Sequence, residues 1–407
     1  MSGSIRLKWL LSESDLRAGV EAEELPLLSV SISWGVRRRD AAGTTTTRAA
    51  AEDLSNYKIC RAGDLVINRM RAFQGALGIA PEDGIVSPDY AVLKVDPRIN
   101  RRWLSFFLTS GSTVATMASL VRGIGGTEAG NVRTPRLNIA DLLSMEAPLI
   151  SAEEQVIIAD YLDREAARID TLIEEQQRLI EMLRERRRLV IANSLPPRPS
   201  LGSGADKLGR TTRIGNGSTP RRESLEYWEG GDVPWLNSSV VNQARVDSAS
   251  EFVTATALSE CHLPIVPVGS VLVGLTGQGK TRGMATILDI KATVNQHLAY
   301  VTPDRGKWWP EYLLWLLTAA YEDLRRVSEE NGSTKGGLTC EALKQLRVAI
   351  PPINEQRRIA LHLDEQTLNT DTLIAETERF IELARERRSA LITAAVTGQI
   401  DVREPVA

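Results

Sequence analysis

The chain has 407 residues, of which 43% are hydrophobic and 25% are charged, and its formal net charge is −3. This composition is ordinary for a globular protein, and the length suggests two or three domains. A membrane-spanning helix needs about 18 apolar residues in a row, and no apolar run in the sequence is that long. The opening residues lack the apolar core of a secretory signal. The three cysteines and three histidines are too scattered for a disulfide framework, a metal site or a histidine-based catalytic triad. We therefore expect a cytoplasmic protein without membrane contact.

A stretch rich in proline, glycine and serine, LPPRPSLGSG at 195–204, predicts a linker near the middle of the chain. The halves on either side of it repeat one another. IDTLIEEQQRLIEMLRERR at 169–187 aligns with TDTLIAETERFIELARERR at 370–388, and the same offset aligns EEQVIIADYLD at 153–163 with NEQRRIALHLD at 354–364. The chain is therefore an internal tandem duplication.

Both repeated segments predict long helices with a narrow apolar seam. The seam positions recur at spacings of three and four, as in a coiled coil, and charged side chains dominate the other faces. These positions are Ile169, Ile173, Gln176, Ile180, Leu183, Arg187 and Val190 in the first copy, and Ile374, Thr377, Ile381, Ala384, Arg388 and Leu391 in the second. Ser151 and Glu154 form a capping-box pattern at the first helix, and Pro351-Pro352 marks the start of the second. Two unrelated surface helices are the plainer interpretation, but the equivalence of the copies favours pairing as an antiparallel coiled coil.

The regions that precede the helices, here called the first head (1–147) and the second head (205–346), have a different pattern. Short apolar runs broken by Gly, Pro, Asn and Asp predict strands, for example SVLVGL at 270–275. RRWLSFFLTS at 101–110 and PEYLLWLLTAAYEDLRR at 310–326 predict helices. The fold class expected is α+β, with two mixed α/β heads that have diverged far more than the helices.

The segment GLTGQGKT at 274–281 matches the pattern of a phosphate-binding P-loop. In such a loop Lys280 would reach the terminal phosphates and Thr281 would bind magnesium, at the start of a helix. Here Gly283 and a β-branched run follow at once, so a glycine-rich hairpin is the better interpretation, with a nucleotide-binding protein as the alternative. Motifs of amino-methyltransferases, dinucleotide-binding folds, helicase motors and nucleases are also missing from the sequence, so we expect a non-catalytic chain.

The order of variable region, repeated helix, variable region and repeated helix resembles the specificity (S) subunit of type I restriction-modification enzymes over nearly the whole chain. The matching motifs in the conserved regions are Glu154-Gln155, PPINEQ at 351–356, the D-T-L-I motifs that begin at Asp170 and Asp371, and LITAAVTGQIDVRE at 391–404. In the second variable region they are GNGSTPRRESLEYWEGGDVPWLNSS at 215–239 and NGSTKGGLTCEALKQL at 331–346. The first copy departs from the pattern where Ile150-Ser151 replace the paired prolines.

This resemblance implies a subunit that reads a bipartite, asymmetric DNA target, one half-site with each head. The implied domains are a first target-recognition domain at 1–147, a first spacer helix at 148–195, a linker at 196–204, a second target-recognition domain at 205–346, a second spacer helix at 347–398 and a tail at 399–407. The implied partners are double-stranded DNA, two modification subunits and, where the system also restricts, restriction subunits. S-adenosylmethionine, ATP and magnesium would bind to those partner subunits and not to this chain. A coiled-coil scaffold without a DNA role remains a further alternative.

Base reading favours Arg, Lys, Asn and Gln side chains on loops. The candidate DNA-binding residues are Arg37, Arg38, Arg39, Arg48, Arg69 and Arg71 in the first head, and Arg221, Arg222, Gln278, Lys280, Arg282 and Lys335 in the second. Each of them could equally be a solvated surface charge. His297 is expected to be structural because no ligand partner lies at useful spacing.

Overall fold

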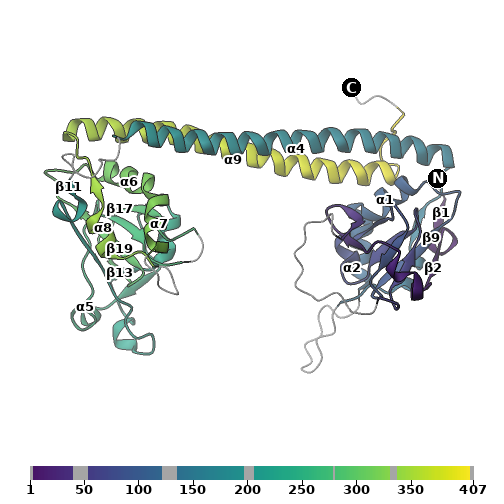
Figure 1. Ribbon diagram of the computed structural model, residues 1–407, viewed down its shortest axis with the longest axis horizontal. Coiled ribbons are helices and arrows are strands. Elements are labelled where there is room, and N and C mark those ends of the chain that lie inside the picture. Colours follow the sequence, from purple (N-terminus) through teal and green to yellow (C-terminus); the bar gives the residue numbers. More distant parts are fainter. Residues whose placement is uncertain are drawn as a thin grey trace. The chain divides into compact units, whose positions relative to one another are not determined.

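The computed structural model describes residues 3–39, 54–121, 135–196, 206–277, 280–330 and 337–403. It divides into two compact units, Met1–Gln177 with Glu378–Ala407, and Arg178–Thr377. Each unit combines one head with the adjoining halves of two long helices, α4 (Ala152–Ser194) and α9 (Ile353–Val396) (Figure 1). None of the helices in the described ranges is long and apolar enough to cross a membrane.

The first unit is built on a four-stranded antiparallel sheet. Its order is β2 (Leu11–Ser14), β9 (Tyr90–Val95), β6 (Leu65–Asn68) and β7 (Leu77–Ile79). Three strand pairs accompany it: β1 (Ser4–Arg6) with β10 (Glu146–Pro148), β3 (Leu28–Ser31) with β4 (Gly35–Arg38), and β5 (Lys58–Cys60) with β8 (Gly84–Val86). The helices of this head are α1 (Arg101–Thr109), α2 (Gly111–Leu120) and α3 (Ile139–Ser144). The fully buried Trp103 of α1 lies in the core that joins this sheet to α4.

The second unit repeats this plan with additions. Its main sheet has the order β12 (Thr212–Asn216), β19 (Leu298–Pro303), β16 (Val271–Gly274), β17 (Ala285–Leu288) and β14 (Arg245–Val246). A second sheet contains β15 (Glu251–Val253), β13 (Val233–Leu236) and β18 (Thr293–Val294), and β11 (Asp206–Lys207) pairs with β20 (Arg347–Val348). The helices are α5 (Ala255–Glu260), α6 (Pro310–Ala319), α7 (Tyr321–Glu330) and α8 (Cys340–Gln345). Figure 1 shows α6 between the main sheet and the long helices, where its buried face belongs to the same core as the start of α9.

The two heads therefore share one fold although their sequences have diverged. The order β2-β9-β6-β7 in the first head corresponds strand by strand to β12-β19-β16-β17 in the second. The register agrees as well, because Asn68 lies opposite Tyr90 as Gly274 lies opposite Leu298. The α+β duplication predicted from the sequence is confirmed, and it extends through the heads.

Helices α4 and α9 run antiparallel in each unit. In the first unit, Nε of Arg388 lies 2.9 Å from a carboxylate oxygen of Asp170, and Arg403 forms an ion pair with Glu154 at 2.7 Å. In the second unit, Nε of Arg187 lies 2.9 Å from a carboxylate oxygen of Asp371. The two arginine–aspartate pairs join equivalent residues of the two repeats, so each unit stabilises its part of the helix pair with the same contact.

The predicted seam is buried or half-buried where it is apolar. Ile180 and Ile381, at equivalent positions, are each 6% exposed. The polar seam residue Thr377 is 8% exposed, and its hydroxyl donates a hydrogen bond to the carbonyl of Leu373 at 2.7 Å. The predicted cap is present too, since the backbone N–H of Glu154 donates to Oγ of Ser151 at 3.1 Å.

In each unit one glutamine, at an equivalent position of the repeat, fastens the head to its long helix. In the first unit, Oε1 of Gln155 accepts from the backbone N–H of Asn100 just before α1 at 2.8 Å, and Nε2 donates to the carbonyl of Ile150 at 3.3 Å. In the second unit, Gln356 accepts from the N–H of Trp309 just before α6 at 2.9 Å. Its Nε2 donates at 2.8 Å to the carbonyls of Lys307 and Pro351.

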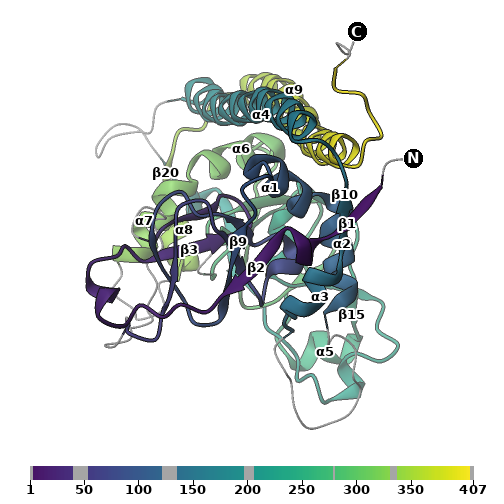
Figure 2. The ribbon, with the colours of Figure 1, turned by 90° about the vertical axis from the view of Figure 1, so that its right-hand side faces the viewer.

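These buried amides satisfy backbone groups at the start of two helices at once, where intrahelical partners are lacking. Ion pairs add to the attachment in the first unit, where Arg102 of α1 binds Asp160 and Asp163 of α4, both at 2.6 Å. Figure 2 shows α1 beneath α4. In the second unit the indole N–H of Trp315 donates to Asp364, the residue equivalent to Asp163, at 2.8 Å. Each head is thus held in a fixed orientation on its helix.

Candidate nucleic-acid interface

The loop that follows β6 or β16, together with the segments against it, is called here the tip of each head. In the first head the backbone N–H of Leu137 donates to the carbonyl of Arg69, and in the second head the N–H of Leu338 donates to the carbonyl of Leu275, both at 2.9 Å. Arg69 and Leu275 are the first residues after β6 and β16. This repeated hydrogen bond draws the segment before α3 or α8 against the loop, so equivalent loops meet at the same end of both sheets.

The first tip gathers several arginines around Tyr90. Burial raises the pKa of the Tyr90 phenol, and the positive charges of Arg39 and Arg71 oppose that rise. Arg71 is exposed, and Nε of Arg69 donates to the carbonyl of Leu137 at 3.3 Å. The exposed Arg136, which the sequence analysis did not select, forms an ion pair with Asp89 at 3.3 Å. Four cationic side chains of this head are therefore placed around one loop cluster.

The other two candidates on the β3–β4 hairpin have partners of their own. Nε of Arg38 donates to Glu82 at 2.7 Å, and this hydrogen bond lowers the pKa of the Glu82 carboxyl. Arg37 is exposed and lies over the ring of Trp34 at 5.8 Å. The structure thus separates Arg37 and Arg38, which are held on the hairpin, from Arg39, which approaches the tip.

In the second head, Arg222 is held in an aromatic cluster. Its guanidinium lies 4.1 Å from the ring centre of Trp228 and 4.9 Å from that of Trp235, and it forms an ion pair with Glu251. The hydrogen bond from Arg222 lowers the pKa of Glu251. The backbone carbonyl of the exposed Arg221 accepts from the indole N–H of Trp228 at 3.0 Å. These contacts stabilise the fold of the segment that carries the two arginines, and the side chain of Arg222 is 50% exposed at its surface.

The glycine-rich segment at 274–281 connects two antiparallel strands, β16 and β17. No helix begins at Lys280 within the described part of this loop, because a turn at Arg282–Gly283 leads directly into β17. The hairpin interpretation is confirmed, and the helix that a P-loop needs to hold phosphate is replaced by a strand. Lys280 is exposed beside the turn, whereas Arg282 is only 8% exposed.

A polar network that the sequence analysis missed joins three loops at the second tip. The hydroxyl of Thr219 donates to Oε1 of Gln296 at 2.7 Å, and Nε2 of Gln296 lies 3.3 Å from Nε2 of His297. Nδ1 of His297 lies 3.0 Å from the hydroxyl of Thr276 in the glycine-rich loop. His297 therefore links two loops of the tip. The polar triplet Asn295-Gln296-His297 between two strands was the available sequence signal.

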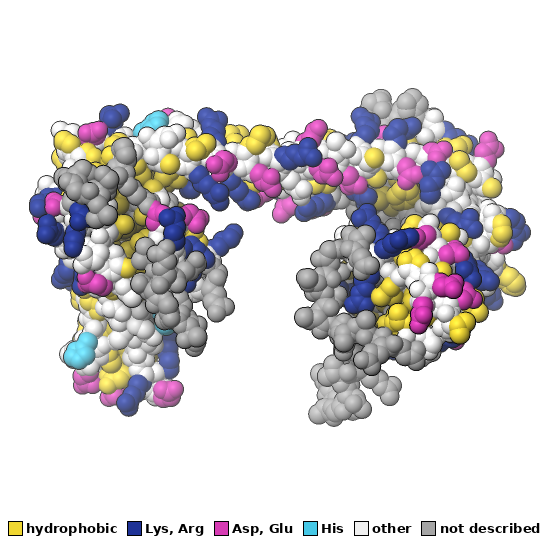
Figure 3. All heavy atoms as spheres, viewed as in Figure 1, with side chains coloured by type: hydrophobic (Ala, Val, Ile, Leu, Met, Phe, Trp, Pro, Cys, Tyr) yellow, Lys and Arg dark blue, Asp and Glu magenta, His cyan; other side chains and the backbone are white. Residues whose placement is uncertain are grey.

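Three of the twelve predicted residues, Arg48, Gln278 and Lys335, lie outside the described residues. Of the rest, Arg39, Arg69 and Arg71 belong to the first tip. Lys280 belongs to the second tip, on the glycine-rich loop that also contains Thr276. Figure 3 shows basic and acidic side chains intermingled along the long helices, in agreement with ion pairs such as Arg379–Glu382. The RERR runs of these helices are thus mixed charged faces and not a single basic stripe.

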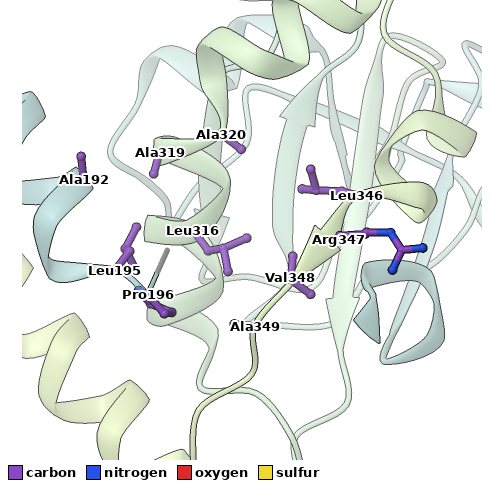
Figure 4. Close-up of a pocket in the computed structure, with 10 residues that line it drawn as sticks. All are labelled: Ala192, Leu195, Pro196, Leu316, Ala319, Ala320, Leu346, Arg347, Val348 and Ala349. Carbon is purple, nitrogen blue, oxygen red and sulfur yellow. The ribbon is translucent and has the colours of Figure 1, made fainter. Parts of the chain in front are cut away.

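A hollow of about 160 Å³ lies in the second unit, and Figure 4 shows its lining residues on the end of α4, helix α6 and the segment that leads into α9. Its lining is apolar apart from Arg347, whose side chain points away from the other residues. Among the described residues there is also no group of three His, Cys, Asp or Glu side chains suited to a metal ion. The tips are therefore the better candidates for a binding surface.

Comparison with known proteins agrees with this architecture. Residues 207–383 match the type I restriction modification DNA specificity domain. The chain is 24% identical over 181 residues to the type I restriction enzyme EcoR124I/EcoR124II specificity subunit of Escherichia coli, a match that covers 44% of this chain and 45% of that protein. It is 32% identical over 159 residues to the type I restriction enzyme MjaIX specificity subunit of Methanocaldococcus jannaschii, covering 38% and 35%. The matched segments thus span less than half of these relatives.

A chain of the same fold occurs in a solved structure that addresses complex assembly and conformational transition of the type I R-M system. Its TM-score is 0.74 at 17% identity, and the match covers 98% of both chains. The domain match lies in the second repeat, and the structural match extends the likeness in fold to both. Residues 207–383 thus match the type I restriction modification DNA specificity domain, and the structural match shows one fold across both repeats.

Proposed function

We propose that this chain is the DNA sequence-recognition subunit of a type I restriction-modification complex and reads a bipartite, asymmetric target. The observation that carries the proposal is that the heads share one strand order and one attachment to the long helices, yet present different side chains at their tips. Two copies of the same reader would recognise a symmetric sequence, whereas two readers with different surfaces select two different half-sites.

Base and phosphate contacts would come from the loops of the two tips. In the first head, Arg39, Arg69, Arg71 and Arg136 supply cationic donors around Tyr90. In the second head, Lys280 and the network of Thr219, Gln296, His297 and Thr276 supply donors and acceptors on three adjoining loops. Arg37, Arg38, Arg221 and Arg222 are proposed as flanking contacts, and their existing partners would hold them in place. We assign the two target-recognition domains to 1–147 and 205–346 and the spacer helices to 148–195 and 347–398.

Apolar side chains at equivalent positions of the long helices, all exposed except the half-buried Leu179, support two copies of one partner, which we propose to be the modification subunits. In the first unit, Leu172, Phe380 and Leu383 are 42%, 44% and 47% exposed. The residues at the equivalent repeat positions in the second unit are Leu373, Leu179 and Met182, of which Leu373 is 48% and Met182 62% exposed. Exposed apolar side chains that a duplication has kept in both copies favour a partner surface.

Methylation and cutting would be carried out by partner subunits, with S-adenosylmethionine, ATP and magnesium bound there, and this chain would contribute no catalytic residue. A restriction subunit would join the same assembly. The proposal places the complex with the chromosome in the cytoplasm.

Exchange of the first head tests the two-reader proposal directly. Replacement of residues 1–147 by the first head of another specificity subunit, in the complex assembled with its modification subunits, is expected to change one half-site of the methylated sequence and leave the other unchanged. The measurement is base-resolution methylation of a randomised DNA library. A chimera that changes both half-sites, or neither, in a complex that still methylates would contradict the proposal.

A further inference from the structure

Gln296 is an exposed side chain that is held in one position by its neighbours. It lies in the turn between β18 and β19, where its backbone carbonyl accepts a hydrogen bond from Nδ2 of Asn216 at 3.3 Å. Its side-chain amide is bound on one side by Thr219 at 2.7 Å and on the other by the ring of His297 at 3.3 Å. An exposed glutamine loses rotamer entropy when it is fixed, and hydrogen bonds at the surface return little stability. Such an arrangement is typical of a side chain prepared for a ligand.

The backbone around Gln296 is also held in place by its contacts. Asn295 is 5% exposed, its N–H donates to the carbonyl of Leu236 at 2.9 Å, and its side chain accepts from the N–H of His297 at 3.0 Å. The facing loop runs through Gly217, where any Cβ atom would collide with the carbonyl of Val294. The turn therefore cannot move without the loop that carries Thr219.

The hydrogen-bond partners determine which groups of Gln296 remain available. The amide Nε2 can only donate, so Nε2 of His297 accepts in their contact, and Nδ1 of His297 carries the proton that is donated to Thr276. The amide oxygen accepts from Thr219. After these bonds, the planar amide of Gln296 retains one N–H donor and one oxygen lone pair.

Adjacent donor and acceptor groups of an amide match one base in the major groove. Adenine presents N7 as an acceptor beside the N6 amino group as a donor, and a glutamine binds both in a bidentate fashion. We propose that Gln296 reads an adenine in the half-site recognised by the second head, and that Thr219, His297 and Thr276 position its amide. The inference rests on the proposed function, because it needs the second tip to face the major groove.

The first head lacks this reader. The register of the two sheets makes Tyr90 equivalent to Leu298, so the position of Gln296 is occupied by Pro88 in the first head. Proline has no side-chain donor or acceptor. Gln296 would therefore contribute to the difference between the two half-sites.

The test uses the full chain assembled with its modification subunits, after the wild-type target has been mapped by methylation. Gln296→Ala is expected to reduce the preference for adenine over the other bases, at one position of the second half-site, by roughly 10- to 100-fold. The readout is binding to a set of duplexes that carry each base at each position. Gln243→Ala, at another exposed glutamine of the same head, is the matched control and is expected to leave every preference unchanged.

Two further variants separate positioning from folding. Thr219→Val removes the hydroxyl that fixes the amide and is expected to lower the same adenine preference, whereas Thr219→Ser retains the hydroxyl and is expected to preserve it. If Gln296→Ala leaves all base preferences of the second half-site unchanged, the inference is overturned while the mapped wild-type target still supports the proposed function. If the wild-type complex shows no sequence-selective binding at all, the proposed function itself fails, and the inference with it.

Discussion

Replacement of Gln356 by leucine is expected to lower the free energy of unfolding of the second unit by about 3 kcal/mol or more. The side chain is fully buried and its amide makes three hydrogen bonds, with the N–H of Trp309 and the carbonyls of Lys307 and Pro351. Leucine has a similar volume but makes none of these three bonds, which lie in a partly buried setting. Each unsatisfied buried group costs roughly 1–3 kcal/mol. Urea unfolding of the purified chain, followed by tryptophan fluorescence, measures the change.

Two variants control this experiment. Gln356→Glu keeps the acceptor for Trp309 but removes the amide donors, so its effect is also expected to be destabilising. Gln345→Leu, on the exposed surface of α8, removes a hydrogen bond with Glu341 in a solvated setting and is expected to change stability by no more than about 0.5 kcal/mol. An unfolding midpoint for Gln356→Leu that equals the midpoint of Gln345→Leu would show that the amide does not fasten the second head to α9.

Replacement of Gly217 by alanine is expected to cost about 3 kcal/mol and to abolish recognition of the second half-site. The added methyl group would overlap the backbone carbonyl of Val294, which cannot rotate away as a flexible side chain could. The loop or the facing strand must move, and the hydrogen bond from the N–H of Gly217 to the carbonyl of Asn295 at 3.2 Å would be lost. Because Thr219 lies on this loop, its contact with Gln296 would be lost as well.

The matched control for this change is Gly306→Ala, since a Cβ atom at Gly306 meets only the side chain of Asp304 at 3.4 Å. Thermal unfolding and methylation of the mapped target are measured for both variants. We expect Gly306→Ala to behave as wild type. Gly217→Ala should unfold at a lower temperature and should fail to select the second half-site. Normal selectivity in the Gly217→Ala complex would mean that this loop does not position the second tip.

The long helices and their pairing could be predicted because the information is local and repeated. The seam at positions such as Ile180 and Ile381 follows from spacing alone. The ion pairs of Arg187 and Arg388 are also equivalent, because the duplication aligns the two arginines and their two aspartate partners. The hairpin at 274–281 was also predictable, because Gly283 and the β-branched residues after it exclude the helix of a P-loop.

Contacts between residues far apart in the sequence could not be predicted in this way. The Glu-Gln motif was evident at Gln155 and Gln356, but its role depends on Asn100 and Trp309, which tertiary folding brings near. The segment 310–326 was predicted as one helix, yet it breaks at Ala320 into α6 and α7. No breaker residue marks that point, and Ala320 itself is buried in the core.

The candidate site was predicted only in outline for the same reason. Charged residues on loops pointed to Arg39, Arg69 and Arg71, which the structure gathers near Tyr90. His297 was expected to be structural because no ligand partner lies at useful spacing, but folding brings Thr276 of another loop within 3.0 Å of its ring. Recognition surfaces made of several loops require the fold before their members can be identified.

The most direct test of the central claim is a base-resolution methylation map of the native host genome, with and without the gene for this chain. The account predicts that deletion removes methylation from one asymmetric, bipartite adenine-containing motif, and that restoring the gene brings it back. The same map gives both half-sites, against which the Gln296 and Gly217 variants are read. A genome in which this bipartite motif is methylated equally with and without the gene would contradict the account.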